Sequence, residues 1–213
     1  MVHKKFFDRN LWIRIAITCL FGPMILYIVA QGVVVVSIFI LIVTFMLGRE
    51  WLSLIKHKRK LIYYLMGMLY IALPSISIIY IADRCGDHYF LVKITCLVWA
   101  SDIGAYVVGK FFGGPRINPK ISPNKTWSGY YGGLFFTSLI GYFLGFSVPF
   151  SAMISLLAQL GDLGESMIKR KFNVLNSSNL IPGHGGVMDR FDSFVLVSLF
   201  LALSDIISRI LYG

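Results

Sequence analysis

Charged residues are scarce in this chain of 213 residues: they make up 14% of it, whereas hydrophobic residues make up 57%. A soluble domain of this size could not bury so much apolar surface. Several apolar runs instead approach the ~20 residues that a helix needs to cross a bilayer. The composition therefore excludes an ordinary soluble protein and predicts an all-α fold, a polytopic transmembrane helical bundle with polar loops on its cytoplasmic side.

Cysteine and acidic residues are also few. The three cysteines, Cys19, Cys85 and Cys96, have neither CxxC nor zinc-ligand spacing, so nothing indicates a cysteine metal centre. Ten acidic residues stand against twenty Lys and Arg, and a net charge of +10 would suit nucleic acid. The basic residues, however, lie in short loops between apolar runs, as they do on the cytoplasmic side of membrane proteins. We therefore expect no nucleic-acid partner, and a basic face that suits anionic lipids and a polyanionic substrate.

The apolar runs predict about seven spans, with the N-terminus inside. They are expected at residues 11–30, 32–47, 61–82, 89–108, 130–146, 149–163 and 194–212. The first run follows a basic start and could be a signal peptide, but no clear small-x-small cleavage site follows it, so we expect a retained helix. With this topology all of the twenty basic residues except Arg84, Lys93 and Arg209 lie on the cytoplasmic side.

One long segment, residues 161–193, is rich in charge, glycine and small hydroxyl residues. Asp162, Glu165, Ser166 and Lys169 have offsets that put them on one face of a helix continuing from the sixth span. They suit a cation and a phosphate, or else form a solvated helix end with internal i,i+4 pairs. Asp162 weakens the second interpretation, because a carboxylate near the hydrocarbon needs a metal or a distant cation.

The same segment continues with a glycine-rich turn around His184, PGHGG. Such glycines allow several N–H groups to converge on an anion, although an ordinary tight turn before the last helix would look the same. Asp189 and Asp192 follow three residues apart and can face one way. Oxygen ligands with a single histidine and no cysteine favour Mg²⁺ over zinc.

Two further features lie upstream of this segment. The loop 109–128 contains no acid, and its Ser122, Lys125 and Thr126 lie around prolines, which indicates either a phosphate cradle or a basic loop at the membrane surface. Asp102 lies in the fourth apolar run and is either a ligand or the partner of a loop lysine. Together the features indicate nucleotidyl or phosphoryl transfer to a membrane-embedded acceptor.

Residues 166–192, within the charged segment 161–193, also match a long sequence signature position by position. Its matching positions are Ser166, Lys169, Arg170, Ser178, Ile181, Pro182, His184, Gly185, Gly186, Val187, Asp189, Arg190, Phe191 and Asp192. This pattern resembles that of the phosphatidate cytidylyltransferase (CDP-diacylglycerol synthase) family. The stretches SDIGAYVVGKFFG and PKISPNKTWSG also resemble motifs of that family. Because the resemblance is dense from residue 99 to 193, we interpret residues 1–213 as a single membrane domain with N-terminal helices (1–98) and a catalytic half (99–213).

The resemblance implies transfer of a cytidylyl group from CTP to phosphatidate, dependent on Mg²⁺. It further implies a place among the lipids of a bacterial inner membrane, with the active site facing the cytoplasm, and leaves open a homodimer. By position, Asp162 and Asp189 would hold the metal, and Lys169 would act with them in catalysis. The expected substrate-binding residues are Asp102, Ser122, Lys125, Thr126, Ser166, Arg170, His184, Gly185, Gly186, Arg190 and Asp192.

Two departures from the family pattern leave an alternative open. The family's Lys-Asp pair is replaced by Leu175 and Asn176, and the Glu of K-T-W-E-G by Ser128. A non-catalytic member that binds CTP or anionic lipid is therefore the competing hypothesis; a transporter is less favoured because the charges gather on one face. We expect activity to persist, because every residue assigned to the metal is present.

Overall fold

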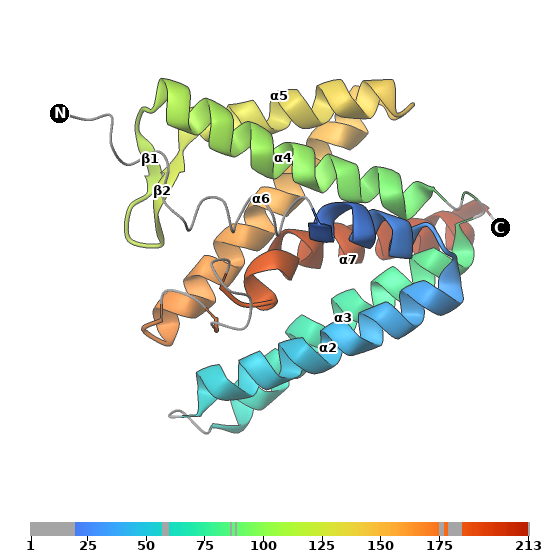
Figure 1. Cartoon of the computed structure of the whole chain (residues 1–213), viewed down its shortest axis with the longest axis horizontal. Helices are drawn as coiled ribbons and strands as arrows, with labels where there is room; N and C mark the ends of the chain where they lie inside the picture. The colour runs from blue at the N-terminus through green and yellow to red at the C-terminus, as the bar shows by residue number, and fades with distance from the viewer. Residues whose placement is uncertain are drawn as a thin grey trace.

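The computed structural model describes residues 20–56, 60–85, 87, 89–174, 177–178 and 185–212, and these are mostly helical (Figure 1). The all-α fold class predicted from the composition is confirmed. A helical stretch, Leu20–Val29, comes before the longer helices. These are α2 (Val33–Ile55), α3 (Leu61–Arg84), α4 (Phe90–Phe112), α5 (Trp127–Phe143), α6 (Val148–Lys171) and α7 (Met188–Tyr212).

Within the described residues, four helices are long and apolar enough to cross a membrane: α2, α3, α4 and α7. Their outward faces carry large apolar side chains, such as Ile38 and Phe45 on α2, which are 55% and 68% exposed and suit contact with lipid. Helix α5, with 17 residues, is shorter, and α6 ends in the charged residues Lys169, Arg170 and Lys171. Counting Leu20–Val29, the described residues form seven helices, as many as the spans predicted, but only four of these helices are long and apolar enough to cross a membrane.

Two helix boundaries lie well away from those predicted, the end of α2 and the start of α7. Helix α2 continues to Ile55, beyond the end predicted at residue 47, because Leu47, Trp51 and Leu54 extend its buried face at helical spacing. Helix α6, by contrast, continues from Val148 through the charged residues to Lys171, as expected for a helix that extends the sixth apolar run. Helix α7 begins at Met188 instead of residue 194, so Asp189 and Asp192, which were expected to precede the helix, lie in its first two turns.

The polar loop predicted at 109–128 contains a small antiparallel hairpin that the sequence reading missed. Strand β1 (Arg116–Asn118) pairs with β2 (Ser122–Thr126). The Asn118 side chain accepts hydrogen bonds from the backbone N–H groups of Lys120 and Ile121, at 3.1 and 3.3 Å, which closes the turn. The hairpin leads directly into α5, which Thr126 caps by accepting from the Gly129 N–H at 3.2 Å.

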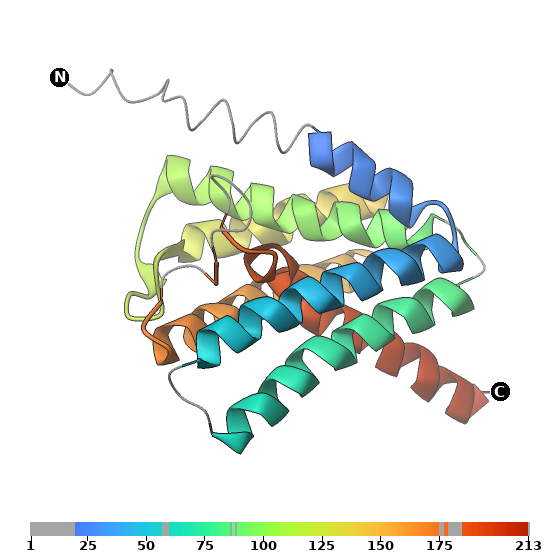
Figure 2. The same cartoon turned by 60° about the horizontal axis from the view of Figure 1, so that its bottom comes forward.

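The helices form three layers, with α4 and α5 on one side, α2 and α3 on the other, and α6 and α7 between them (Figures 1 and 2). Helices α4 and α5 approach closely because of their glycines: a Cβ on Gly129 would lie 2.7 Å from the Ala105 carbonyl oxygen. Between α4 and α6, Ser101 Oγ lies 2.8 Å from Ser155 Oγ. The middle layer is therefore in contact with both outer layers, and its charged residues meet the polar loops at one end.

Candidate active site

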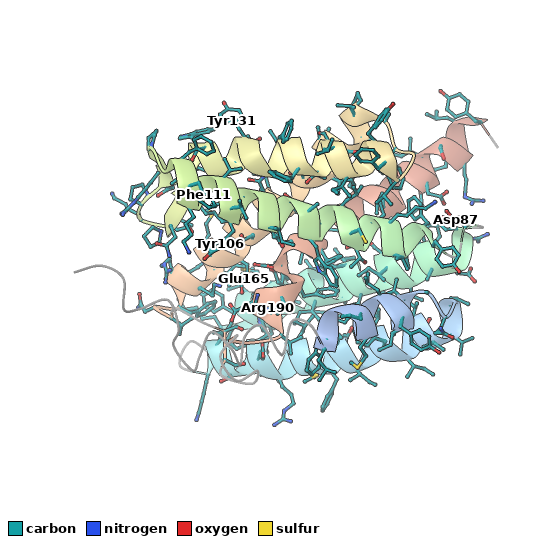
Figure 3. The ribbon with its side chains drawn as sticks, turned by 45° about the horizontal axis from the view of Figure 1, so that its top comes forward. Asp87, Tyr106, Phe111, Tyr131, Glu165 and Arg190 are labelled. Carbon is teal, nitrogen blue, oxygen red and sulfur yellow. The ribbon has the colours of Figure 1, made fainter. Side chains whose placement is uncertain are left out.

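The candidate site lies at the end of the bundle where α4 and α6 finish and α7 begins. Glu165 and Arg190 lie in the same half of the molecule as Phe111, whereas Asp87 lies at the opposite end (Figure 3). Contributions come from α2, α6, α7, the β1–β2 hairpin and the described residues that precede α7. The loop 109–128 and the 161–193 segment, both expected on the cytoplasmic side, are in contact through Lys125 and Asp162 and through Arg170 and Ile121.

Three carboxylates from two helices form the centre of the site. Asp162 and Glu165 of α6 and Asp192 of α7 each offer an oxygen, and these oxygens lie within 4.8 Å of one another. Glu165 is fully buried, and its Oε1 has no hydrogen-bond partner among the described residues. Because neighbouring buried carboxylates are unfavourable without positive charge, and because oxygen is the ligand of hard cations, this cluster fits a divalent metal ion.

The backbones of α6 and α7 come close together beside this cluster. Gly161 faces the Asp192 carbonyl oxygen so closely that a Cβ would overlap it. The missing side chain is what allows Asp192 to approach Asp162. Gly161 thus has a packing role in assembling the acidic cluster.

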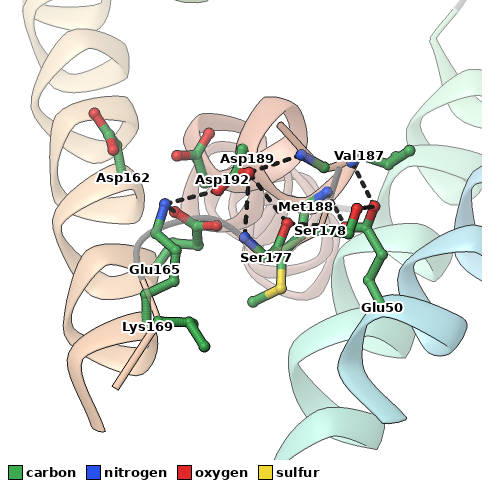
Figure 4. A network of polar contacts seen from close by, with 12 residues as sticks. Glu50, Asp162, Glu165, Lys169, Ser177, Ser178, Val187, Met188, Asp189 and Asp192 are labelled. Atoms are coloured by element: carbon green, nitrogen blue, oxygen red, sulfur yellow. Dashed lines mark hydrogen bonds and ion pairs between the residues drawn. The ribbon is translucent and has the colours of Figure 1, made fainter. Parts of the chain in front are cut away.

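Lys169 joins the cluster to the start of α7. Its Nζ lies 2.5 Å from Glu165 Oε2 and 2.7 Å from Asp189 Oδ1. The other oxygen of Asp189 accepts from the Gly186 N–H at 2.8 Å and lies 3.2 Å from Ser177 Oγ. Asp189 thus contacts both Lys169 and the chain preceding α7 (Figure 4), and its role as the second metal ligand stays a prediction.

The hairpin supplies the cation that Asp162 requires. Lys125 Nζ lies 2.5 Å from Asp162 Oδ2, so the partner is distant in sequence, as expected for an acid with no basic residue one turn away. Asp102 was predicted to be a ligand or the partner of a loop lysine; its oxygens lie 3.4 and 3.5 Å from Ser193 Oγ. The site is therefore acidic at its centre, with an ammonium group on either side.

The remaining residues predicted to bind substrate lie in several different elements, and one of them lies outside the described residues. Arg170 donates to the carbonyl oxygens of Ile121, at 3.1 Å, and Val174, at 2.9 Å, and so attaches the hairpin to the end of α6. Ser166 is buried in α6, Ser122 begins β2, Gly185 has a φ of 83°, and Arg190 is exposed. His184, Leu175 and Asn176 lie outside the described residues. The substrate-binding roles assigned to these positions stay predictions.

Glu50 of α2 is the residue that sequence reasoning missed. It is 2% exposed and accepts hydrogen bonds from the backbone N–H groups of Val187 and Met188, at 2.8 and 2.9 Å (Figure 4). One signal could have revealed it: Glu50 is the only acid between Asp8 and Asp83, and it lies in a helix of mostly apolar residues. An acid in such a place needs a buried partner.

Comparison with known proteins identifies the family. Residues 56–206, which include α6 and the site residues of α7, match the profile of the Cytidylyltransferase family. The chain belongs to this family. The resemblance found in the sequence motifs is thereby confirmed.

Relatives of the chain within the cytidylyltransferase family carry a common name. A phosphatidate cytidylyltransferase of Rickettsia bellii is 36% identical over 71% of this chain and 72% of its own length. One from Rickettsia felis is 29% identical over 93% of this chain and 94% of its own. One from Brucella suis is 39% identical over 64% of this chain and 54% of its own.

Proposed function

We propose that this chain transfers the cytidylyl group of CTP to phosphatidate, giving CDP-diacylglycerol and pyrophosphate. The observation that carries the proposal is the cluster of Asp162, Glu165 and Asp192 between Lys125 and Lys169. It lies within the region that matches the family, and relatives along that region are named phosphatidate cytidylyltransferase. A metal-binding acidic centre flanked by ammonium groups suits a nucleoside triphosphate and a phosphate monoester.

We infer that Asp162, Glu165 and Asp192 hold the divalent cation, and that it is Mg²⁺. Bound there, it would supply positive charge to the phosphates of CTP and to the leaving pyrophosphate. This keeps Asp162 as a ligand, replaces the predicted Asp189 by Glu165 and Asp192, and leaves Asp189 to orient Lys169. The buried, unpartnered oxygen of Glu165 is the main support for this assignment.

The proposed reaction requires little acid–base catalysis by the protein. A phosphate oxygen of phosphatidate attacks the α-phosphorus of CTP; the new P–O bond forms as the bond to the bridging oxygen breaks, and pyrophosphate leaves with that electron pair. The attacking phosphate is already anionic, so no strong general base is required. Lys169, oriented by Glu165 and Asp189, would donate to phosphate oxygens, and Lys125 would do so from the hairpin.

The proposed setting is a bacterial inner membrane with the site facing the cytoplasm. The apolar outer faces of α2, α3, α4 and α7 support membrane integration. The concentration of basic residues in the loops at the site's end supports the cytoplasmic orientation. In that orientation CTP would reach the site from the aqueous side and phosphatidate from the bilayer.

The test is a lipid-extraction assay with radiolabelled CTP, phosphatidate and Mg²⁺. We expect wild-type protein to form labelled CDP-diacylglycerol, and Asp162→Asn, Glu165→Gln and Asp192→Asn each to lower turnover by at least ~10³-fold. Asp83→Asn, at an exposed acid outside the site, is the matched control and should be near normal. Binding of CTP without labelled lipid would favour the non-catalytic alternative, and normal turnover in a cluster variant would remove that residue from the site.

A further inference from the structure

Glu50 makes four hydrogen bonds with the residues that start α7 and with those before it. Besides the N–H groups of Val187 and Met188, it accepts from Ser178 Oγ at 2.6 Å and from Ser177 Oγ at 3.0 Å. Each carboxylate oxygen therefore has one backbone donor and one hydroxyl donor. Such complete pairing is what makes a carboxylate tolerable in the interior of a protein.

The contact is an N-terminal cap supplied by a different helix. The first N–H groups of a helix have no partner within it, and negative charge at this end is stabilising. Here the acceptor for α7 comes from α2, far away in the sequence. Glu50 thereby fixes where α7 begins and how it is rotated.

The site residues of α7 follow immediately from this fixed point. Asp189 and Asp192 are one and four residues beyond Met188, so any shift of the first turn moves both carboxylates. A second link runs through Ser177, whose Oγ lies within hydrogen-bond distance of both Glu50 Oε2 and Asp189 Oδ2. Gly186 is packed against this link: a Cβ there would lie 2.5 Å from Glu50 Oε2.

We propose that Glu50 is a positioning residue of the active site. It holds the first turn of α7 and the Ser177–Ser178 segment so that Asp192 meets Asp162 and Glu165, and Asp189 meets Lys169. The effect on turnover rests on the proposed function. The effect on metal binding depends only on the position of the acidic cluster, so the two can fail separately.

Two substitutions separate the charge of Glu50 from its reach. Glu50→Gln keeps the size but turns one acceptor into an NH₂ donor that faces the donors of the first turn of α7. Glu50→Asp keeps the charge on a side chain one methylene shorter. The control is Thr44→Val on the same helix, which removes a 2.7 Å hydrogen bond to Ser75 of α3 and touches nothing in the site.

The experiment measures Mn²⁺ binding by electron paramagnetic resonance on the full-length proteins in detergent, together with kcat and KM. We expect Glu50→Gln to weaken Mn²⁺ binding and to lower kcat by about 10- to 100-fold, as for other residues that orient metal ligands. Glu50→Asp should be intermediate and Thr44→Val close to wild type. Hydrogen exchange at the amides of Val187 and Met188 should be faster in Glu50→Gln than in wild type and unchanged in Thr44→Val.

Three outcomes decide the matter. If Glu50→Gln loses thermal stability but binds Mn²⁺ and turns over within twofold of wild type, Glu50 is only a structural contact and the inference is wrong. The inference is also wrong if Thr44→Val loses as much metal affinity as Glu50→Gln. If wild type makes no CDP-diacylglycerol but Glu50→Gln still loses Mn²⁺ affinity, the positioning role stands and the proposed function fails.

Discussion

Lys125 and Asp162 form an ion pair, Nζ to Oδ2 at 2.5 Å, that joins strand β2 to helix α6. The pair is partly exposed, with 23% of the lysine side chain and 33% of the aspartate side chain accessible. It places an ammonium group directly beside the acidic cluster. The hairpin thereby contacts the proposed metal site, and in the proposed function its lysine would bind a phosphate once a metal ion compensates Asp162.

Lys125→Met should lower kcat/KM for CTP by about tenfold or more, because a charge-assisted hydrogen bond to phosphate contributes about 1.5–3 kcal/mol. Binding of Mn²⁺ without nucleotide should not weaken, since the substitution removes a competing cation. Steady-state kinetics and electron paramagnetic resonance would measure the two effects. The control is Lys93→Met, which breaks a 2.7 Å ion pair with Asp87 at the other end of the bundle. An unchanged kcat/KM in Lys125→Met would contradict the phosphate-binding role.

Gly161→Ala should separate α6 from α7, because the added Cβ overlaps the Asp192 carbonyl oxygen. Overpacking of this kind costs about 1–3 kcal/mol, and here it also displaces a proposed metal ligand. Thermal unfolding and turnover should both fall. Gly164→Ala on the same helix is the matched control: a Cβ there meets nothing within 4 Å, and alanine favours the helix by about 1 kcal/mol. Equal behaviour of the two variants would show that the close approach at Gly161 is unimportant.

The orientation of the bundle can be tested by cysteine labelling. After replacement of Cys19, Cys85 and Cys96, single cysteines at Lys120 and Lys171 should react with a membrane-impermeant maleimide from the cytoplasmic side, because both lie at the basic end. A cysteine at Arg84 should react from the opposite side. Labelling of the first two positions from opposite sides would exclude the proposed topology.

The loss of the family's Lys-Asp pair at Leu175 and Asn176 predicts a non-additive result. If the lysine and aspartate are partners, their joint loss leaves no unpaired charge, whereas restoring one alone creates one. Leu175→Lys and Asn176→Asp should therefore help little or reduce turnover singly, and the double variant should be tolerated or faster. Turnover that appears only in the double variant would mean that the wild-type chain is the non-catalytic alternative.

Much of the fold could be predicted from the sequence, because bilayer thickness sets the length of an apolar helix. The end of α2 could not, since the apolar run stops before Arg49, whereas Leu47, Trp51 and Leu54 continue the buried face of the helix. The hairpin was missed because its pairing depends on one turn residue, Asn118, in a stretch without alternating apolar residues.

The site was predictable to the extent that its residues share one helix face. The spacing of Asp162, Glu165 and Lys169 placed them together on α6, and the need of Asp162 for a metal or a distant cation followed from its apolar surroundings. The identity of that cation, Lys125, depends on tertiary packing and was not predictable. The role of Glu50 was not predictable for the same reason, because its backbone donors belong to the first turn of a helix at the other end of the sequence.

The contact between Glu50 and α7 has a consequence for biogenesis. Helix α2 leaves the ribosome long before α7 exists, so during synthesis Glu50 must keep its solvation shell at the water-facing end of its helix. Insertion of α7 replaces that water with the N–H groups of Val187 and Met188 and brings Asp192 to the cluster in the same step. A nascent chain that stops before α7 would therefore lack Asp192 and with it the proposed metal cluster, and α7 would bring both Asp192 and the donors for Glu50.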